Sequence, residues 1–319
     1  MTTRRRFLST ALAGIAAAPC ALAAGAATRG LSGGSPADEE LLLPPNRINP
    51  GTWDDSTLTA GWVGHSTVLL NLFGSWVLTD PVFSRRVGLD VAGLLVIGPQ
   101  RLVAPALAVD ELPPLGVVLI SHAHMDHMDL PTLRKLKRST PLVLPKNTAD
   151  LVAGMGFDTV YELGWGEWTE VGGLRVEAIE VTHIGWRYPW EPDKSRGFEY
   201  GRSYNAYLLT RNGRHVVFAG DTAYCEYFKP LRERLNSVDL AVVPIGGYDP
   251  WEQNHATPEQ AVEMCRQMGA RNILPVHWHT FLSPTEDLLE PIERLREAAR
   301  GTSMTIVLDA IGETWVLSG

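Results

Sequence analysis

The sequence predicts an α/β protein in which two β-sheets are flanked by helices. Short runs rich in β-branched and aromatic residues, several of them alternating apolar and polar positions, have the length of strands. They lie near 58–63, 66–72, 75–79, 117–120, 142–145, 174–182, 204–210, 214–219, 239–243, 272–276, 304–308 and 313–317. Helical patterns lie near 131–138, 147–154, 226–236, 257–268 and 285–299. Two strand-rich halves with late helices favour paired sheets with helices outside them.

The N-terminal segment has the pattern of an export signal. A twin-arginine pattern at 3–8 precedes an apolar, alanine-rich stretch at 9–18. Small residues at 21–23 and at 24–26 offer two cleavage sites. A disordered basic tail is the alternative. We therefore expect a twin-arginine signal peptide over 1–27, a bacterial source, passage through the twin-arginine export machinery, and a periplasmic or secreted mature protein.

The rest of the chain predicts a single catalytic domain. Residues 28–52 are rich in Gly, Ser, Pro and Ala, which predicts a linker or an arm that wraps the fold. No linker, low-complexity tract or charge block divides 53–319. Past the signal only Cys225 and Cys265 remain, so no disulfide framework is expected. One bridge between them is an open alternative, and Cys225 is expected to be a small buried residue.

The charge of the chain excludes some partners. The formal net charge is -8 at pH 7, and the first 27 residues contribute three arginines and no acidic residue. An acidic protein is not expected to bind DNA or RNA backbones. Weak repulsion from anionic bilayers is expected too. No segment after the predicted signal approaches the length and apolarity of a membrane span, so any membrane contact is expected to be peripheral.

A cluster of histidines follows the predicted strand at 117–120. The run SHAHMDH at 121–127 places three imidazoles and a carboxylate in one short loop before a predicted helix start at Leu130. Such side chains are costly to bury unpaired. Imidazole nitrogen and carboxylate oxygen suit borderline divalent metal ions. A single histidine at a strand end is more often structural, but this spacing indicates a metal site.

Residues of the types that bind metal ions also stand at the ends of three other predicted strands. His183 ends the strand at 174–182, Asp221 follows the strand at 214–219, and His277 ends the strand at 272–276. Two metal ions need about seven protein ligands. A purely structural explanation would leave this recurrence of His and Asp at strand ends unexplained.

Together these residues resemble the metallo-β-lactamase superfamily. The resemblance rests on His122-x-His124-x-Asp126-His127 followed by His183, Asp221 and His277. The segments GWVGHSTVL (61–69), LTDPVFS (78–84), FAGDTAY (218–224), PIGGY (244–248) and VHW (276–278) resemble the branch of N-acyl-phosphatidylethanolamine-hydrolysing phospholipases D. The resemblance spans about Trp53 to Trp315. It implies a four-layer αββα sandwich with two mixed sheets, whose metal ligands gather at one edge.

The resemblance also implies a dinuclear site. His122, His124 and His183 would hold one ion; Asp126, His127 and His277 would hold the other; Asp221 would bridge them. Two Zn²⁺ ions are expected, with iron or manganese as alternatives. A hydroxide shared by the ions is the expected nucleophile, and an aspartate at the bridging position favours phosphodiester chemistry.

Three more residues carry narrower predictions. Asp80 matches the aspartate of the first superfamily motif and is expected to orient the histidine loop; a turn-capping role is the alternative. His255 matches a family histidine that reaches the substrate phosphate, where it would steady charge or protonate the leaving alkoxide; a histidine at a helix entry is the alternative. His65 is expected to support a ligand or to be structural.

The long segment from 184 to 203 follows a predicted ligand. It holds aromatic residues mixed with arginine, which would suit an anionic substrate with apolar tails. A covering loop with inward-packed aromatics is the alternative.

The leading functional hypothesis is a zinc-dependent phosphodiesterase of the phospholipase D type. It would hydrolyse N-acyl-phosphatidylethanolamine or a similar phospholipid. An exported hydrolase of a lactone, amide or β-lactam bond is one alternative, since pockets of one fold vary. A non-catalytic metal-binding module is the other.

Overall fold

The computed structural model describes residues 41–317, apart from 92–93, 189, 192–200, 282–284 and 286. The predicted signal peptide at 1–27 and the first part of the predicted linker lie outside these residues. From Leu41 onward the chain lies against the domain, because Leu42 donates its backbone N–H to Leu102 O at 2.9 Å. Ile48 is buried in the core.

The first sheet mixes antiparallel and parallel strands. Its order is β16-β1-β2-β3-β6-β7-β8. The strands are β1 (Leu58–Gly64), β2 (Thr67–Leu72), β3 (Ser75–Thr79), β6 (Val117–Leu119), β7 (Leu142–Pro145), β8 (Val160–Leu163) and β16 (Thr314–Val316). Pairing is antiparallel from β16 to β3 and parallel from β3 to β8.

The second sheet repeats this mixture. Its order is β15-β14-β13-β12-β11-β10-β9. The strands are β9 (Trp168–Val171), β10 (Leu174–Ile179), β11 (Ala206–Arg211), β12 (Arg214–Phe218), β13 (Leu240–Pro244), β14 (Asn272–Val276) and β15 (Thr305–Ile306). Pairing is antiparallel from β9 to β12 and parallel from β12 to β15.

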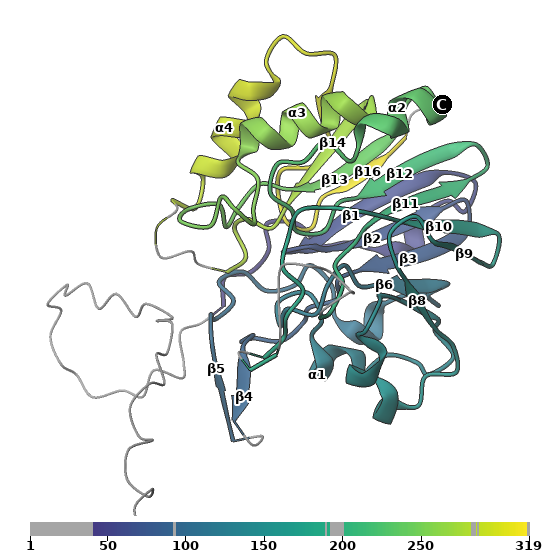
Figure 1. Cartoon of the computed structure of the whole chain (residues 1–319), viewed down its shortest axis with the longest axis vertical. Coiled ribbons are helices and arrows are strands. Elements are labelled where there is room, and N and C mark those ends of the chain that lie inside the picture. Colours follow the sequence, from purple (N-terminus) through teal and green to yellow (C-terminus); the bar gives the residue numbers. More distant parts are fainter. Residues whose placement is uncertain are drawn as a thin grey trace, which may run out of the picture. The chain divides into compact units, whose positions relative to one another are not determined.

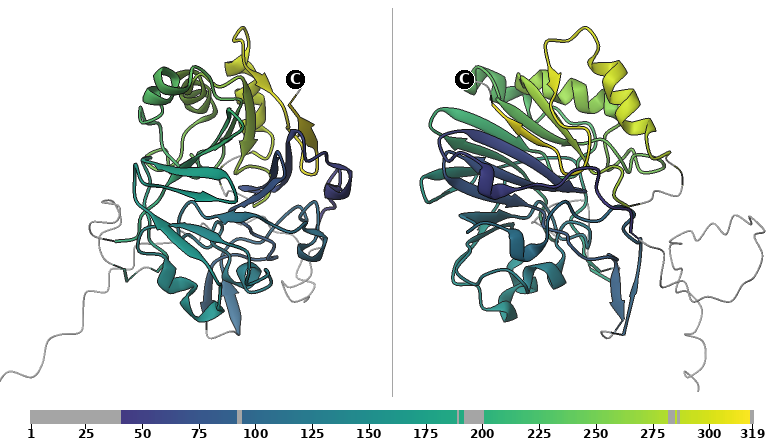
Figure 2. Two further views of the ribbon diagram at one scale, coloured as in Figure 1. Left: turned by 90° about the vertical axis from the view of Figure 1, so that its right-hand side faces the viewer. Right: turned by 180° about the vertical axis from the view of Figure 1, so that it is seen from behind.

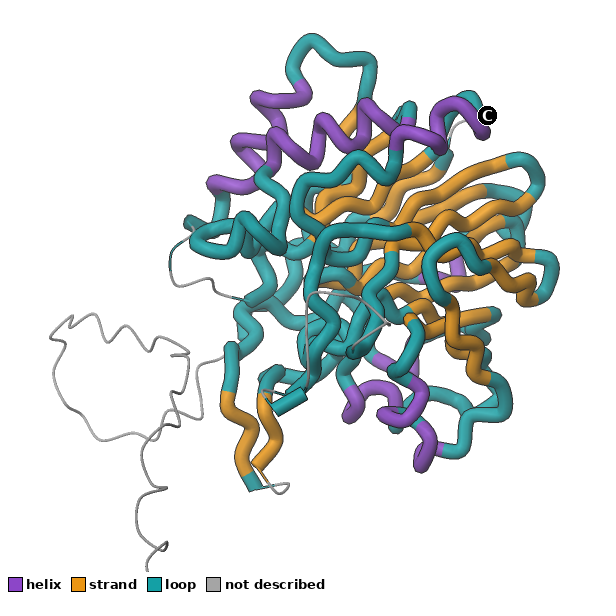
Figure 3. Tube along the Cα trace, in the orientation of Figure 1, coloured by secondary structure: helices purple, strands orange, loops and turns teal. Residues whose placement is uncertain are grey.

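Helices cover the outer faces of the stacked sheets (Figures 1 and 2). The helices α2 (Lys229–Leu235), α3 (Pro258–Met268) and α4 (Glu290–Ala299) lie beside the second sheet, and α1 (Leu130–Leu133) lies beside the first. Figure 3 shows the strands between the two groups of helices. The predicted αββα sandwich with mixed sheets is therefore confirmed. None of the helices among the described residues combines the length and apolarity needed to cross a bilayer.

Several elements differ from the sequence-based expectation. The helix expected at 131–138 is the single turn α1, because the following N–H groups bond three residues back, as Lys135 does to Thr132 O. The helix expected at 147–154 is a pair of 3-10 turns, Ala149–Leu151 and Ala153–Met155. The edge strands β8 and β9 were not expected, because their partly exposed residues give weak apolar patterns.

Strand direction brings the site to one edge. In the first sheet β1, β3 and β6 run the same way, and in the second sheet β10, β12, β13 and β14 do. The carboxyl ends of each set therefore share one edge of their sheet. Loops that follow these strands carry every candidate site residue predicted from the sequence.

A pair of stacked indoles joins the two sheets at this edge. Trp62 on β1 is fully buried and stacks on Trp278, with ring centroids 5.4 Å apart. Trp62 Nε1 also donates to His65 O at 2.8 Å. Trp62 lies just before His65, and Trp278 directly follows His277. The stacked indoles therefore hold together the two chain segments that carry these site residues.

Replacing Trp62 with alanine should strongly destabilise the fold. Loss of a buried aromatic side chain typically costs ~3–5 kcal/mol. Guanidinium unfolding of the Trp62→Ala variant measures this loss. The matched control is Trp168→Ala, because Trp168 is 52% exposed and lies over Arg175; it should cost under ~1 kcal/mol. Equal losses in the two variants would contradict the stacking role.

Candidate metal centre

The structure brings all the sequence-predicted site residues together. They come from loops far apart in the sequence, each after a strand of one of the two sheets. They are His65, Asp80, His122, His124, Asp126, His127, His183, Asp221, His255 and His277. Within groups of them, the nitrogen and oxygen atoms lie within 4.8 Å of one another.

Three of these residues have an unusual backbone. His65, Asp80 and His277 each directly follow a strand and have φ values of 53°, 31° and 66°. A residue with a side chain pays about 1 kcal/mol or more in the left-handed region. Each turns the chain sharply at the strand end, so that its side chain reaches the shared edge. Strain of this kind clusters at functional sites.

The first group consists of three imidazoles. His122 Nε2 lies 2.8 Å from His124 Nδ1, and His183 Nε2 lies 3.3 Å from His122 Nε2 and 3.4 Å from His124 Nδ1. Three ring nitrogens therefore face one point. His122 is 0% and His183 is 4% exposed, so bulk solvent does not reach these two rings.

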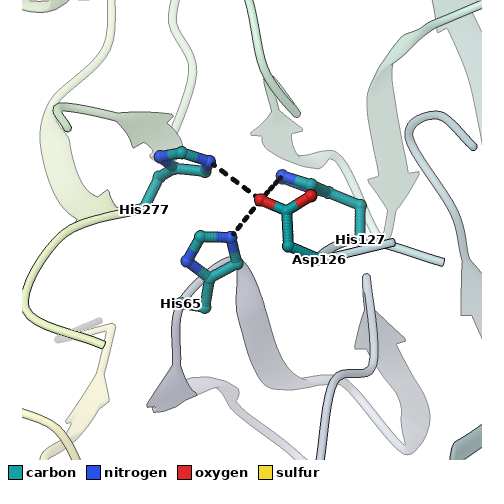
Figure 4. A group of neighbouring side chains, drawn as sticks. All are labelled: His65, Asp126, His127 and His277. Atoms are coloured by element: carbon teal, nitrogen blue, oxygen red, sulfur yellow. Dashed lines mark hydrogen bonds and ion pairs between the residues drawn. The ribbon is translucent and has the colours of Figure 1, made fainter. Parts of the chain in front are cut away.

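The second group combines carboxylate and imidazole. Asp126 Oδ2 lies 3.7 Å from both His127 Nε2 and His277 Nε2 (Figure 4). His65 Nε2 lies 3.2 Å from the same oxygen. His65 therefore contacts Asp126, in the supporting position that the sequence suggested. The Asp126 side chain is 32% exposed, which opens this side of the site.

Asp221 lies between the two groups. Its Oδ2 is 3.0 Å from His127 Nε2 and 3.1 Å from His277 Nε2 in the second group. The same oxygen is 3.9 Å from His122 Nε2 and 4.0 Å from His183 Nε2 in the first. One carboxylate thus contacts both halves. His255 Nε2 also approaches this oxygen, at 3.3 Å, so His255 belongs to the site and is not only a residue before α3.

Outer hydrogen bonds set the tautomers of four imidazoles. His183 Nδ1 faces Asn254 O at 2.9 Å and His277 Nδ1 faces Gly246 O at 3.2 Å; a carbonyl only accepts, so Nδ1 carries the proton in both. His127 Nδ1 donates to Asp80 Oδ2 at 2.6 Å. His122 Nδ1 donates to Ser121 Oγ, whose own proton goes to Asp80. In their neutral forms, all four therefore turn an Nε2 lone pair inward.

Asp80 organises the histidine loop. It accepts from Ser121 N at 2.7 Å, from Ser121 Oγ and from His127 Nδ1. Asp80 is fully buried, and burial raises the pKa of its carboxyl, although these donors oppose the rise. The contacts agree with an orienting role and not with a simple turn cap.

The first group favours neutral imidazole. Burial and neighbouring imidazoles hold the pKa of His122 and of His183 well below the usual range. Burial also lowers the pKa of His124 to about 4. Near neutral pH these rings present lone pairs and not protons, which is the state that binds a metal ion.

The second group and Asp221 favour positive charge. Burial opposes ionisation, but His127 holds the pKa of both Asp126 and Asp221 well below the usual range. In return, and against burial, Asp221 raises the pKa of His277 to about 10 and raises that of His127 well above its usual value. Two carboxylates thus draw cations to this half of the site.

The donor set fits metal ions. Asp221 Oδ1 and the Nε2 atoms of His127 and His277 are buried and make no well-directed hydrogen bond within the described part of the chain. Buried polar atoms are normally satisfied. Converging imidazole nitrogens and carboxylate oxygens are the ligands of borderline divalent ions.

The supporting role of one residue could not be found from the sequence. Arg187, in the segment that follows His183, is buried, and its Nη1 donates to Ala123 O and Met128 O, both at 2.9 Å. It therefore braces the two ends of the loop that carries His124, Asp126 and His127. No local pattern links residues so far apart in the chain. Of the aromatic residues and arginines that the sequence places in the segment 184–203, Arg196, Phe198 and Tyr200 lie outside the described residues.

Cys225 and Cys265 are both buried and are not joined by a disulfide. Thr222 Oγ1 contacts Cys225 Sγ at 3.8 Å. Cys225 is therefore a small buried residue beside the Asp221 loop.

Comparisons with known proteins agree with this geometry. Residues 75–278 match the model of the β-lactamase superfamily domain. The chain is 33% identical to N-acyl-phosphatidylethanolamine-hydrolyzing phospholipase D 1 of Caenorhabditis elegans, over 89% of this chain and 83% of the relative. It is 32% identical to the mitochondrial N-acyl-phosphatidylethanolamine-hydrolyzing phospholipase D of Saccharomyces cerevisiae, over 75% of this chain and 51% of the relative.

A solved structure shares the fold. An isothiocyanate hydrolase from Delia radicum gut bacteria aligns over 82% of this chain and 99% of its own, with a TM-score of 0.62 and 18% identity. Fold and site thus define a metal-dependent hydrolase of the metallo-β-lactamase superfamily. Within that superfamily, the chain belongs to the branch of the N-acyl-phosphatidylethanolamine-hydrolysing phospholipases D.

Replacing Asp80 with alanine should weaken metal binding without unfolding the protein. The change removes the acceptor that orients His127 and Ser121, and loss of such a partner typically lowers metal affinity about 10–100-fold. Competition with a chromophoric chelator measures the affinity.

The matched control is Asp239→Ala. Asp239 is equally buried and accepts from His215 N at 2.9 Å, but it precedes β13 at the opposite edge of the sheet. Its loss should leave metal affinity unchanged, and a similar fall in both variants would reject the specific role of Asp80.

Proposed function

We propose that the protein is a dinuclear phosphodiesterase of the phospholipase D type. Its substrate would be N-acyl-phosphatidylethanolamine or a similar amine-headed phospholipid. The position of Asp221 Oδ2, within 4.0 Å of imidazole nitrogens from both groups, carries the dinuclear part of the proposal. The two phospholipase D relatives support the substrate class.

The proposed metal ligands fall into the two groups of side chains described above. His122 Nε2, His124 Nδ1 and His183 Nε2 would hold one ion. Asp126, His127 Nε2 and His277 Nε2 would hold the other, with Asp221 shared. Zinc suits this set of nitrogen and oxygen donors, and iron and manganese are the alternatives. Two such ions lower the pKa of water toward neutrality and neutralise charge on a phosphoryl group.

The protein's own groups would complete the reaction. Water adds to phosphorus and the bond from phosphorus to the N-acylethanolamine oxygen breaks, which leaves phosphatidic acid. The departing alkoxide needs a proton. His255 is only 15% exposed, and its Nε2 lies beside Asp221 at 3.3 Å, where an imidazolium could steady the phosphate or supply that proton. Buried Arg187 would keep Asp126 and His127 in register.

Product analysis tests the proposal. Metal-loaded protein is incubated with synthetic N-acyl-phosphatidylethanolamine in ¹⁸O-water, and lipids are identified by mass spectrometry. We expect N-acylethanolamine and ¹⁸O-labelled phosphatidic acid. A parallel panel of lactone, amide and β-lactam substrates covers the alternative bonds. Absence of turnover on every phosphodiester would overturn the assignment, and elemental analysis of the active protein identifies and counts the metal.

The Asp221→Asn variant should lose at least about a hundredfold in kcat, because the shared charge is removed while the shape of the side chain is kept. Asp239→Asn is the matched buried control and should retain full activity. Circular dichroism checks that both variants fold. Full activity of Asp221→Asn would contradict the bridging role.

A further inference from the structure

Arg101 is a buried cation beside the loop that begins at Asp80. It follows the small hairpin of β4 (Leu89–Val91) and β5 (Leu95–Ile97), and it is only 2% exposed. Burial lowers the pKa of its guanidinium to about 10, so the group stays charged near neutral pH. A buried charge is costly unless it is paired or well hydrogen-bonded. The partners of this guanidinium therefore indicate what it does in the fold.

The guanidinium holds backbone carbonyls of the Asp80 loop. Its Nη2 donates to Val82 O, and its Nε donates to Ser84 O at 3.3 Å. Its Nη1 lies 3.5 Å from Val103 O. All the side-chain hydrogen bonds of Arg101 within the described residues go to these three carbonyls. One planar group thus ties two residues that closely follow Asp80 to a neighbouring stretch of chain.

The amide groups of the same loop are fixed as well. Val82 N donates to Thr67 Oγ1 at 3.0 Å, and Ser84 N donates to Asp129 Oδ2 at 3.2 Å. Thr67 Oγ1 in turn donates to Asp80 O at 2.7 Å. Val82 and Ser84 therefore each have both their N–H and their C=O bonded to a buried side chain. Loss of the guanidinium would remove the donors from both carbonyls.

The guanidinium also lies beside His65. Its central carbon is 5.1 Å from the centroid of the Phe281 ring, and Phe281 meets the His65 ring edge to face with centroids 5.0 Å apart. A Cβ on Gly64, where φ is 134°, would lie 3.1 Å from Arg101 Nη1. The backbone directly before His65 therefore passes close to the charged group, and Phe281 fills the space between the two side chains.

Both of these neighbours act on the same half of the metal centre. Asp80 Oδ2 accepts from His127 Nδ1 at 2.6 Å, and His65 Nε2 lies 3.2 Å from Asp126 Oδ2. His127 and Asp126 belong to the second group of proposed ligands. The hydrogen bonds of Arg101 itself reach no proposed ligand, and its burial keeps it from a substrate. Any effect of Arg101 on the site is therefore exerted through other residues.

We propose that Arg101 is a positioning residue for the second group of the metal centre. It would fix Asp80 through the carbonyls of Val82 and Ser84, and His65 through Phe281. A lysine would keep the charge but could not donate from several fixed nitrogens, so the role needs the shape of the guanidinium. The proposal rests on the proposed metal site but not on the proposed substrate.

Zinc affinity of the full chain tests the proposal. It is measured without substrate, by competition with a chromophoric chelator. Arg101→Lys should lower the affinity about tenfold, since outer partners of metal ligands typically contribute 10–100-fold. Arg101→Met is the second variant, because an apolar side chain is tolerated at a buried position, and it should show the same loss. An affinity within about twofold of wild type in either folded variant would overturn the proposal.

A double variant distinguishes positioning from an independent effect. In the Asp80→Ala background the loop no longer contacts His127, so Arg101→Lys should lower zinc affinity by less than about threefold further. Changes that act independently would instead combine in full. A further tenfold loss in the double variant would reject positioning through Asp80.

Leu72→Ala is the matched control for a general loss of stability. Leu72 is fully buried at the end of β2 and pairs with Leu58, at the sheet edge opposite the metal centre. Its replacement should lower the midpoint of guanidinium unfolding and leave zinc affinity unchanged. A tenfold loss of zinc affinity in this control would overturn the specific role of Arg101.

Turnover is measured separately, on the same substrate panel as the wild-type chain. Reduced zinc affinity of Arg101→Lys, with no phosphodiester hydrolysis by the wild-type chain, would support the positioning role and reject the proposed activity. Phosphodiester hydrolysis by the wild-type chain, with unchanged zinc affinity of Arg101→Lys, would reject the positioning role alone.

Discussion

The repulsion among inward-facing lone pairs at one sheet edge is the constraint on which the site depends. The outer partners Ser121 and Asn254 hold the imidazole protons outside, so the inner nitrogens of His122 and His183 approach to 3.3 Å with no donor between them. Two carboxylates add negative charge at the same point. A cation relieves this repulsion, and a proton on His277 relieves part of it. This need for positive charge is the physical reason why the site is suited to bind metal cations.

Such an arrangement must be held by the rest of the fold. The left-handed backbone at His65 and His277 and the crowded imidazoles are unfavourable by themselves. The stacked pair Trp62 and Trp278 locks the two sheets together directly beside these residues. Arg187 adds a second brace across the histidine loop. The edge is therefore preorganised, and little rearrangement is needed when ions bind.

The sequence revealed the ligands more fully than their supports. His122 to His127, His183, Asp221 and His277 each follow a recognisable apolar strand, and strands of one direction deliver their ends to one edge. Asp80 was found from the resemblance to the superfamily. Arg187 was not, because its carbonyl partners are about sixty residues away and carry no side-chain signal. The hairpin β4–β5 was also missed, since its few residues bury no continuous apolar face.

The proposed substrate restricts how the histidine loop can be reached. A phospholipid presents its phosphate only at the bilayer surface, and its acyl chains are costly to withdraw into water. A buried metal centre can reach such a phosphate if the domain lies against the surface with that edge facing the lipid. Specificity for a lipid would then come from where the domain binds as much as from the metal ligands, which relatives with other substrates can share.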